Sequence, residues 1–187
     1  VKILMFNNRI YGLTKGQYSP TSEVGKRTKS TPYGSVDQPL NPISIALGAE
    51  ASFVARSVDV YAGHLQDILQ QAAGHKGTAF IEILQNCNIF NDGAWEAVTE
   101  KDVRDDRNVN LVHGQPLVFG KNKEQGIRLN GFQPEIVQLG NGITEKDLLV
   151  YDAHDPDGRM AWILSRINHP EFPTPIGVFK SVERPVF

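Results

Sequence analysis

The sequence predicts an α/β fold built on a parallel sheet. Apolar, strand-like segments recur in the first half of the 187-residue chain, helical patterns separate them, and the third strand is apolar enough to be buried on both faces. Strands joined by a helix in one sheet are expected to run parallel, with right-handed crossovers. A hydrophobic content of 40% and a charged content of 21% are ordinary for a globular protein.

The first elements are a strand, a long loop and a helix. Residues 2–6 are apolar and predict a buried strand. The loop from Asn7 to about Pro39 is rich in Gly, Ser, Thr and Pro, and loops of this length in compact domains are usually functional or disordered. Asn41 as N-cap and Pro42 at the first helical position predict that a helix begins there.

A strand–helix–strand unit follows. Residues 52–59 predict the second strand and residues 77–84 the third. Between them, residues 62–75 predict an amphipathic helix that ends at Gly74. The apolar face of this helix consists of Leu65, Ile68, Leu69 and Ala72.

The pattern changes after Gln85. Residues 86–110 have no strong period, and residues 113–142 predict short strands and turns. Residues 157–167 predict a short helix, and residues 173–187 a tail broken by prolines. The apolar side of that helix consists of Met160, Ile163, Leu164 and Ile167. A domain boundary is therefore expected near Cys87, with a parallel α/β segment before it and an irregular α+β extension after it.

Composition excludes several classes of protein. A net charge of −2 without a basic stripe argues against nucleic-acid binding, and no apolar run is long enough to cross a bilayer. The single cysteine, Cys87, cannot form an internal disulfide and suits a reducing cytoplasm. Because the chain begins at Val1 inside a predicted strand, we expect further residues ahead of it.

Asn7 and Asn8 stand where the first strand ends. Ligands of open parallel sheets bind beyond the carboxyl ends of the strands, and amide and carbonyl oxygens suit Mg²⁺. Asparagines at strand ends are also common turn formers, and the residues alone favour that reading.

Thr14, Lys15, Gly16 and Gln17 offer a hydroxyl, an ammonium and main-chain N–H groups, which is the chemistry of an anion cradle. The residues alone favour the simpler reading, a solvated turn. The polar, cationic loop that follows could meet a carboxylate substrate or form a solvated face; its residues are Ser19, Thr21, Ser22, Lys26, Arg27 and Lys29.

Cys87 follows the third strand directly. One cysteine cannot hold an iron–sulfur cluster, which needs about four thiolates, so Cys87 is either structural or one ligand among partners elsewhere. The histidines are dispersed and form no metal-type pair, and those that flank the helix, His64 and His75, are expected at the surface.

Four stretches together resemble a known family. They are FNNRIYGLTKGQYSPTS, NPISIALGAEASFVARSVD, KGTAFIEILQNCNIFNDGAW and PTPIGVF. The chain resembles, along essentially all its length, the beta subunits of 2-oxoacid:ferredoxin oxidoreductases, and among them the 2-oxoglutarate branch. The resemblance implies a three-layer thiamine diphosphate-binding fold. Residues 1–87 would be the C-terminal half of that domain, and residues 88–187 the C-terminal extension that beta subunits carry.

The resemblance also implies cofactors and the residues that hold them. Thiamine diphosphate is held through Mg²⁺, to which Asn8 gives its side chain and Ile10 its main-chain carbonyl. Other residues of the loop are expected close to the cofactor (Tyr11, Gly12, Leu13, Thr14) or to the substrate (Lys15, Gln17). Cys87 resembles the last ligand of a 4Fe-4S cluster. The family's other three cysteines and its Gly-Asp-Gly segment are not among the 187 residues, which agrees with missing residues ahead of Val1.

The implied reaction is the oxidative decarboxylation of 2-oxoglutarate to succinyl-CoA in the cytoplasm, with electrons passing through the cluster to ferredoxin. The implied partners are an alpha subunit that supplies a glutamate, ferredoxin, coenzyme A and the 2-oxoacid. Two alternatives remain open: the same chemistry on pyruvate or a branched 2-oxoacid, and a non-catalytic subunit that stabilises a partner without binding a cofactor.

Overall fold

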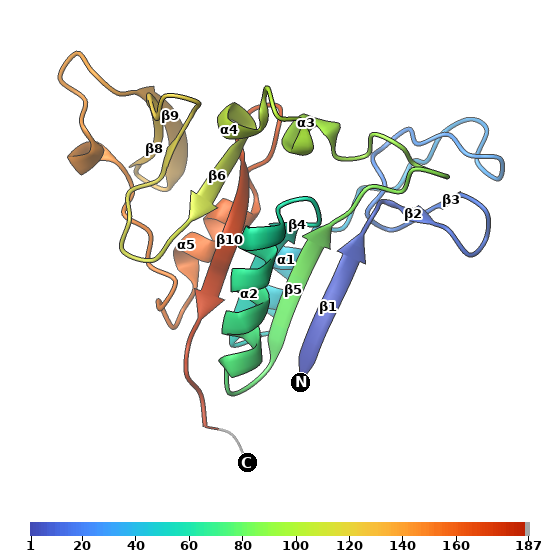
Figure 1. The fold of residues 1–187 in the computed structure, drawn as a ribbon, viewed down its shortest axis with the longest axis horizontal. Helices are drawn as coiled ribbons and strands as arrows, with labels where there is room; N and C mark the ends of the chain where they lie inside the picture. Colours follow the sequence, from blue (N-terminus) through green and yellow to red (C-terminus); the bar gives the residue numbers. More distant parts are fainter. Residues whose placement is uncertain (186–187) are drawn as a thin grey trace.

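A five-stranded mixed sheet forms the centre of the molecule in a computed structural model that describes residues 1–185 (Figure 1). Its spatial order is β1-β5-β4-β10-β6. The strands are β1 (Lys2–Asn7), β5 (Ala79–Leu84), β4 (Phe53–Val58), β10 (Thr174–Ser181) and β6 (Asn108–Leu111). The first three run parallel, β10 runs antiparallel to β4, and β6 runs parallel to β10. The predicted α/β class with a largely parallel sheet is confirmed.

Helices cover both faces of this sheet, which makes three layers (Figure 1). Helix α2 (Ala62–Gly74) lies on one face against β4 and β5, while α1 (Pro42–Gly48) and α5 (Arg159–Ser165) pack together on the other. The predicted cap is confirmed, because the Asn41 side chain accepts a hydrogen bond from the Ser44 N–H at 3.1 Å.

The predicted apolar faces are only partly buried. On α2, Ile68 and Ala72 are buried and Leu65 packs against the core, whereas Leu69 is half-exposed. In the C-terminal helical region, Leu164 and Ile167 are buried. Met160 packs at the edge of the core and Ile163 is half-buried.

The predicted proline-broken tail is wrong for residues 174–181, which form the buried strand β10. Pro175 lies in the parallel register with β6, and its carbonyl accepts a hydrogen bond from Arg56 at 3.2 Å. Gly177, at a φ of +108°, precedes a bulge against β4 between Val178 and Lys180. A glycine and a bulge let a proline-containing segment join the sheet. The last two residues of the predicted tail lie outside the described part.

The region after β5 contains short elements, as predicted. It holds α3 (Glu96–Thr99), α4 (Arg104–Arg107), a 3₁₀ turn (Glu145–Asp147) and a small antiparallel sheet of β7 (Val118–Phe119), β8 (Gln125–Asn130) and β9 (Gln133–Gln138). Buried residues of this region share one apolar cluster with the central sheet; among them are Leu117, Ile127 and Tyr151. Strands β6 and β10 also join that sheet. The boundary near Cys87 stays a prediction.

His64 and His75 are half-buried rather than free at the surface. His64 Nδ1 lies 2.7 Å from the Ser57 hydroxyl of β4, and His75 Nε2 lies 2.8 Å from the Ser52 hydroxyl. The expectation that both are surface groups was wrong because helix α2 packs along β4 and brings its two ends against these serines.

Candidate functional site

The two asparagines at the end of β1 have different roles. The Asn7 side chain is 4% exposed and points into the protein, where its amide donates to Glu82 Oε1 at 2.7 Å. Its oxygen accepts from the Thr21 hydroxyl at 2.7 Å. Asn7 is therefore a structural anchor, and Asn8 is the less buried of the two asparagines.

A buried ion pair supports that anchor. Arg56 Nε of β4 lies 2.7 Å from Glu82 Oε2 of β5, and both side chains are almost completely buried. Arg56 also donates to the Pro175 carbonyl of β10. Hydrogen bonds thus run from β10 through β4 and β5 to the end of β1, across the sheet from its interior to the loop.

A tight turn places Asn8 and Ile10 beside each other. Arg9 has a φ of +55°, and the Asn8 side-chain oxygen accepts from the Ile10 N–H at 3.3 Å. An asparagine that bonds the N–H two residues later forms an Asx turn. Asn8 and Ile10 both border a cavity of about 840 Å³ between the loop, β1 and α1.

That cavity brings together most of the predicted cofactor residues. Asn8, Ile10, Tyr11, Gly12 and Leu13 line it. Its other walls are mainly apolar and include Met5, Phe6, Ile45 and Phe80. Thr14, Lys15 and Gln17 are exposed and do not line it.

The segment expected to cradle an anion closes on itself as a turn between β2 (Ile10–Tyr11) and β3 (Gln17–Tyr18). The Lys15 N–H donates to the Gly12 carbonyl and the Gly16 N–H to the Tyr11 carbonyl, both at 3.0 Å. These two N–H groups are engaged within the turn, so an anion there would be met by the side chains of Thr14, Lys15 and Gln17.

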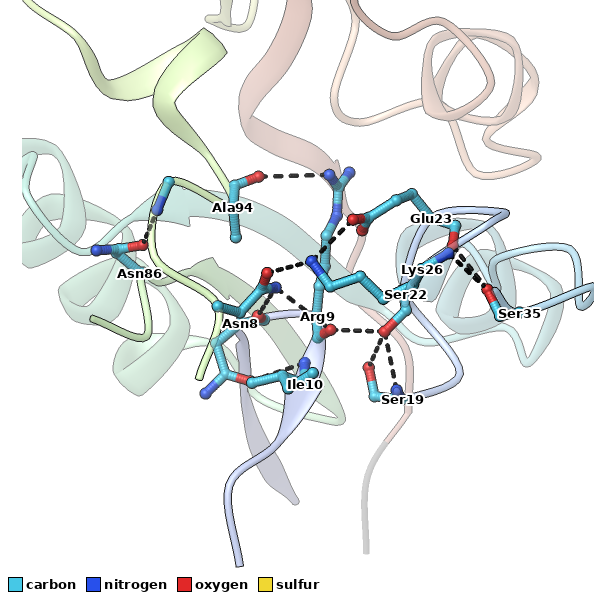
Figure 2. A network of polar contacts seen from close by, with 12 residues as sticks. Asn8, Arg9, Ile10, Ser19, Ser22, Glu23, Lys26, Ser35, Asn86 and Ala94 are labelled. Carbon is cyan, nitrogen blue, oxygen red and sulfur yellow. Dashed lines mark hydrogen bonds and ion pairs between the residues drawn. The ribbon is translucent and has the colours of Figure 1, made fainter. Parts of the chain in front are cut away.

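Asn91 connects the segment after β5 to the loop after β1, where Figure 2 shows Asn8, Arg9 and Lys26 close together. Its amide donates to the Asn8 carbonyl at 2.9 Å and approaches the Arg9 carbonyl at 3.4 Å. Its oxygen accepts from the Lys26 ammonium, which also pairs with Glu23 at 2.9 Å. Lys26 therefore belongs to the interior of this network, whereas Arg27 and Lys29 of the same predicted cationic loop are exposed.

The Arg9 side chain closes the other side of the turn. Its guanidinium lies 3.6 Å from the centre of the Trp95 ring and donates to the Ala94 carbonyl at 3.4 Å. Burial lowers the pKa of Arg9 from its ordinary value, against the opposing charges of Glu23 and Glu82. Trp95 in turn donates to the Asn7 carbonyl at 2.7 Å.

Cys87 is half-buried in the turn that follows β5. Its carbonyl accepts from the Asn91 N–H at 2.9 Å. In the part of the chain from residue 1 to residue 185, no three His, Cys, Asp or Glu side chains gather in a way that could hold a metal ion. Residues 1–185 supply one thiolate, that of Cys87, and by themselves do not fit an iron–sulfur cluster, which needs about four thiolates.

The sequence interpretation missed Asn91, Trp95, Arg56 and Glu82. The last two carried a readable signal, because each interrupts an otherwise apolar buried strand, in FVARSV and AFIEIL. They are also directly paired in the register of β4 and β5. A charge at the centre of each of two neighbouring strands predicts a buried ion pair. No comparable signal marks Asn91 or Trp95.

Residues 1–83 match the family model described as "Thiamine pyrophosphate enzyme, C-terminal TPP binding domain". The 2-oxoglutarate oxidoreductase subunit KorB of Mycobacterium tuberculosis is 48% identical over all of this chain and 50% of its own length. The predicted resemblance to the beta subunits of 2-oxoacid:ferredoxin oxidoreductases is confirmed. Subunit beta of 2-oxoacid:ferredoxin oxidoreductase 1 from Aeropyrum pernix is 45% identical over 49% of this chain and 29% of its own length.

A solved structure supports the same fold. It is a 2-oxoglutarate:ferredoxin oxidoreductase from Magnetococcus marinus with 2-oxoglutarate, coenzyme A and succinyl-CoA bound, and it matches with a TM-score of 0.66. The match covers 98% of this chain and 48% of that chain at 24% identity, so it establishes the fold alone. This chain spans about half the length of the M. tuberculosis protein KorB.

None of the helices in residues 1–185 combines the length and apolar character that a bilayer crossing demands.

Proposed function

We propose that this chain is part of the beta subunit of a 2-oxoglutarate:ferredoxin oxidoreductase, which converts 2-oxoglutarate and coenzyme A to succinyl-CoA. The observation that carries the proposal is 48% identity to KorB along the whole chain. The Asn8–Ile10 turn, which borders a large cavity at the end of β1, supplies a site of the required kind.

The residues present fit part of a magnesium–thiamine diphosphate site. Asn8 offers a hard amide oxygen held in an Asx turn, and Ile10 adds a main-chain carbonyl beside the same cavity. Asn8 and Ile10 would hold Mg²⁺. Tyr11, Gly12, Leu13 and Thr14 would surround the diphosphate, and Lys15 and Gln17 would face the substrate. When bound, thiamine diphosphate supplies an electron sink for the carbanion that decarboxylation of a 2-oxoacid creates.

The chain's own contribution is orientation and exclusion of water. The Asn7–Glu82 hydrogen bond fixes the end of β1 and so holds the main chain that leads into Asn8. Met5, Phe6 and Phe80 give the cavity an apolar wall, which strengthens electrostatic contacts made inside it. A catalytic acid–base pair is not required of this chain if the alpha subunit supplies the glutamate.

Cys87 is proposed as one ligand of a 4Fe-4S cluster whose other ligands come from outside residues 1–187. Among the described residues it supplies that role with a single thiolate after β5. Replacing Cys87 by Ala in the assembled enzyme should lower the iron content and the rate of ferredoxin reduction. Full iron occupancy in that variant would make Cys87 structural.

The proposed partners are an alpha subunit, ferredoxin, coenzyme A and a 2-oxoacid, in the cytoplasm. Exposed apolar side chains on the edge strand β1 support contact with further polypeptide: Ile3 is 44%, Leu4 45% and Phe6 56% exposed. Comparing the turnover of 2-oxoglutarate with that of pyruvate and branched 2-oxoacids separates the leading proposal from the same chemistry on another substrate.

The deciding experiment for the cofactor site is Asn8→Ala in the assembled enzyme. We expect its content of thiamine diphosphate to fall at least tenfold at limiting Mg²⁺, whereas Asn88→Ala, a matched change at an exposed asparagine, should leave it unchanged. If Asn8→Ala retains its cofactor, the assignment fails. Absence of thiamine diphosphate from the unmodified enzyme would favour a non-catalytic subunit.

A further inference from the structure

We propose that Asn91 is a positioning residue that holds the main chain of Asn8 and Arg9 in the shape required to bind Mg²⁺. The inference rests on the proposed function and extends it to a residue in the segment that follows Cys87. Asn91 is 6% exposed, and its side chain reaches from the segment after β5 to Lys26 and to the main chain of Asn8 and Arg9.

The chemistry of its neighbours requires an amide at this position. The Lys26 ammonium can only donate, and the carbonyls of Asn8 and Arg9 can only accept. An asparagine satisfies both sides at once, with its oxygen toward Lys26 and its NH₂ toward the carbonyls. An aspartate would keep the contact with Lys26 but would set a carboxylate oxygen against two carbonyl oxygens.

The main chain that Asn91 contacts is one that needs support. Arg9 adopts a φ of +55°, which is uncommon for a residue other than glycine and persists where surrounding contacts fix it. The Arg9 carbonyl is held from one side by the Ser22 hydroxyl at 2.6 Å and approached from the other by Asn91. The turn that places Asn8 beside Ile10 therefore depends on contacts from outside itself.

The segment that carries Asn91 is itself anchored. The Asn86 side chain accepts from the Gly93 N–H at 3.0 Å and donates to Asp92 at 2.7 Å. The Asn91 N–H binds the Cys87 carbonyl. One residue thus ties the turn that contains Cys87 to the turn that contains Asn8, and a displacement of either turn is transmitted to the other.

The test is a double-mutant cycle in the assembled enzyme with the full-length protein. Mg²⁺ affinity is measured by isothermal titration at saturating thiamine diphosphate. We expect Asn91→Asp to raise the Kd for Mg²⁺ at least tenfold, and Asn88→Asp, the same change at an exposed position of that turn, to alter it less than twofold. In an Asn8→Ala background, Asn91→Asp should raise the Kd for Mg²⁺ by less than a further twofold, because the effects of two residues that act through one another do not add.

Three results would overturn the inference. An Asn91→Asp enzyme with normal Mg²⁺ affinity shows that the contact does not position Asn8. If Asn8→Ala and Asn91→Asp raise the Kd for Mg²⁺ by independent factors that multiply in the double variant, Asn91 has a general structural role instead. If the Asn8→Ala enzyme binds Mg²⁺ with normal affinity, the proposed Mg²⁺ site is itself wrong. If Asn8→Ala weakens Mg²⁺ binding and Asn91→Asp does not, the site stands and only the role of Asn91 is refuted. If the Asn91→Asp enzyme does not assemble, Asn91→Ala takes its place in the same double-mutant cycle. It removes the amide donor without adding a charge.

Discussion

Arg56 and Glu82 form a buried ion pair, with Arg56 Nε 2.7 Å from Glu82 Oε2 and both side chains at most 5% exposed. The pair lies at the centre of the sheet, one partner on β4 and the other on β5. Its position makes it both a structural element and the origin of the hydrogen bonds that reach Asn7.

Glu82→Gln should therefore destabilise the protein strongly. Removing one partner of a buried pair leaves the other charge uncompensated and costs about 3–5 kcal/mol. Urea denaturation of the purified protein measures the loss. Glu135→Gln is the control, since its pair with Arg128 on the β8–β9 hairpin is partly exposed to solvent and should contribute little. Equal effects of the two substitutions would contradict the importance assigned to burial.

His64 should make stability depend on pH. Burial lowers its pKa from the ordinary value near 6.5, more than the hydrogen bond with Asn110 and the charge of Asp67 raise it. The unfolded chain then binds the proton at a higher pH than the folded one. The contribution of neutral His64 is complete above pH about 6.5 and is lost as the pH falls through the lowered, folded-state pKa.

Urea denaturation between pH 5 and pH 8 tests this dependence, at intervals of about half a unit around the ordinary pKa of histidine. His64→Gln should flatten the slope of stability against pH below about 6.5, and His169→Gln, at an exposed histidine, should leave the slope as it is. A wild-type slope in the His64 variant would show that other groups cause the dependence.

Tyr151 should couple the C-terminal region to the sheet. Its fully buried hydroxyl donates to the Phe179 carbonyl, which lies in the bulge of β10 between the residues paired with β4. Burial raises the pKa of Tyr151, so the hydroxyl stays protonated. Tyr151→Phe leaves the carbonyl without this donor and should cost about 1–3 kcal/mol in unfolding free energy. Tyr33→Phe, at a residue 96% exposed, should be near neutral.

Gly177→Ala should be severely destabilising. At its φ of +108° an added Cβ would lie 2.6 Å from the Leu111 carbonyl oxygen. The left-handed backbone and the overpacking together should cost about 2–5 kcal/mol. Gly63→Ala is the matched control, because its Cβ would meet nothing within 4 Å and a helical alanine should stabilise by about 0.4–1 kcal/mol. Thermal denaturation compares the two; a stable Gly177 variant would mean that β10 can shift away from β6.

Local chemistry in the sequence determined a large part of this protein. Apolar strands and a cap at Asn41 predicted the positions of β1, β4, β5 and the start of α1, because periodicity and capping act over a few residues. The burial predicted for residues 2–6 was wrong, because β1 is an edge strand whose side chains are mostly exposed. The resemblance of the Asn8 and Cys87 segments to a known family indicated the cofactor chemistry. The 48% identity to KorB over all of this chain and half of KorB's length confirmed the resemblance.

Contacts between distant segments decided the rest. Prolines in 173–187 argued against a strand, yet the bulge and Gly177 let β10 enter the sheet beside β4. Asn91 lies 83 positions after Asn8, and no local rule relates them. Only tertiary packing brings that amide between Lys26 and the Asn8 carbonyl, because the gain from a buried hydrogen bond depends on which partners the whole fold places around it.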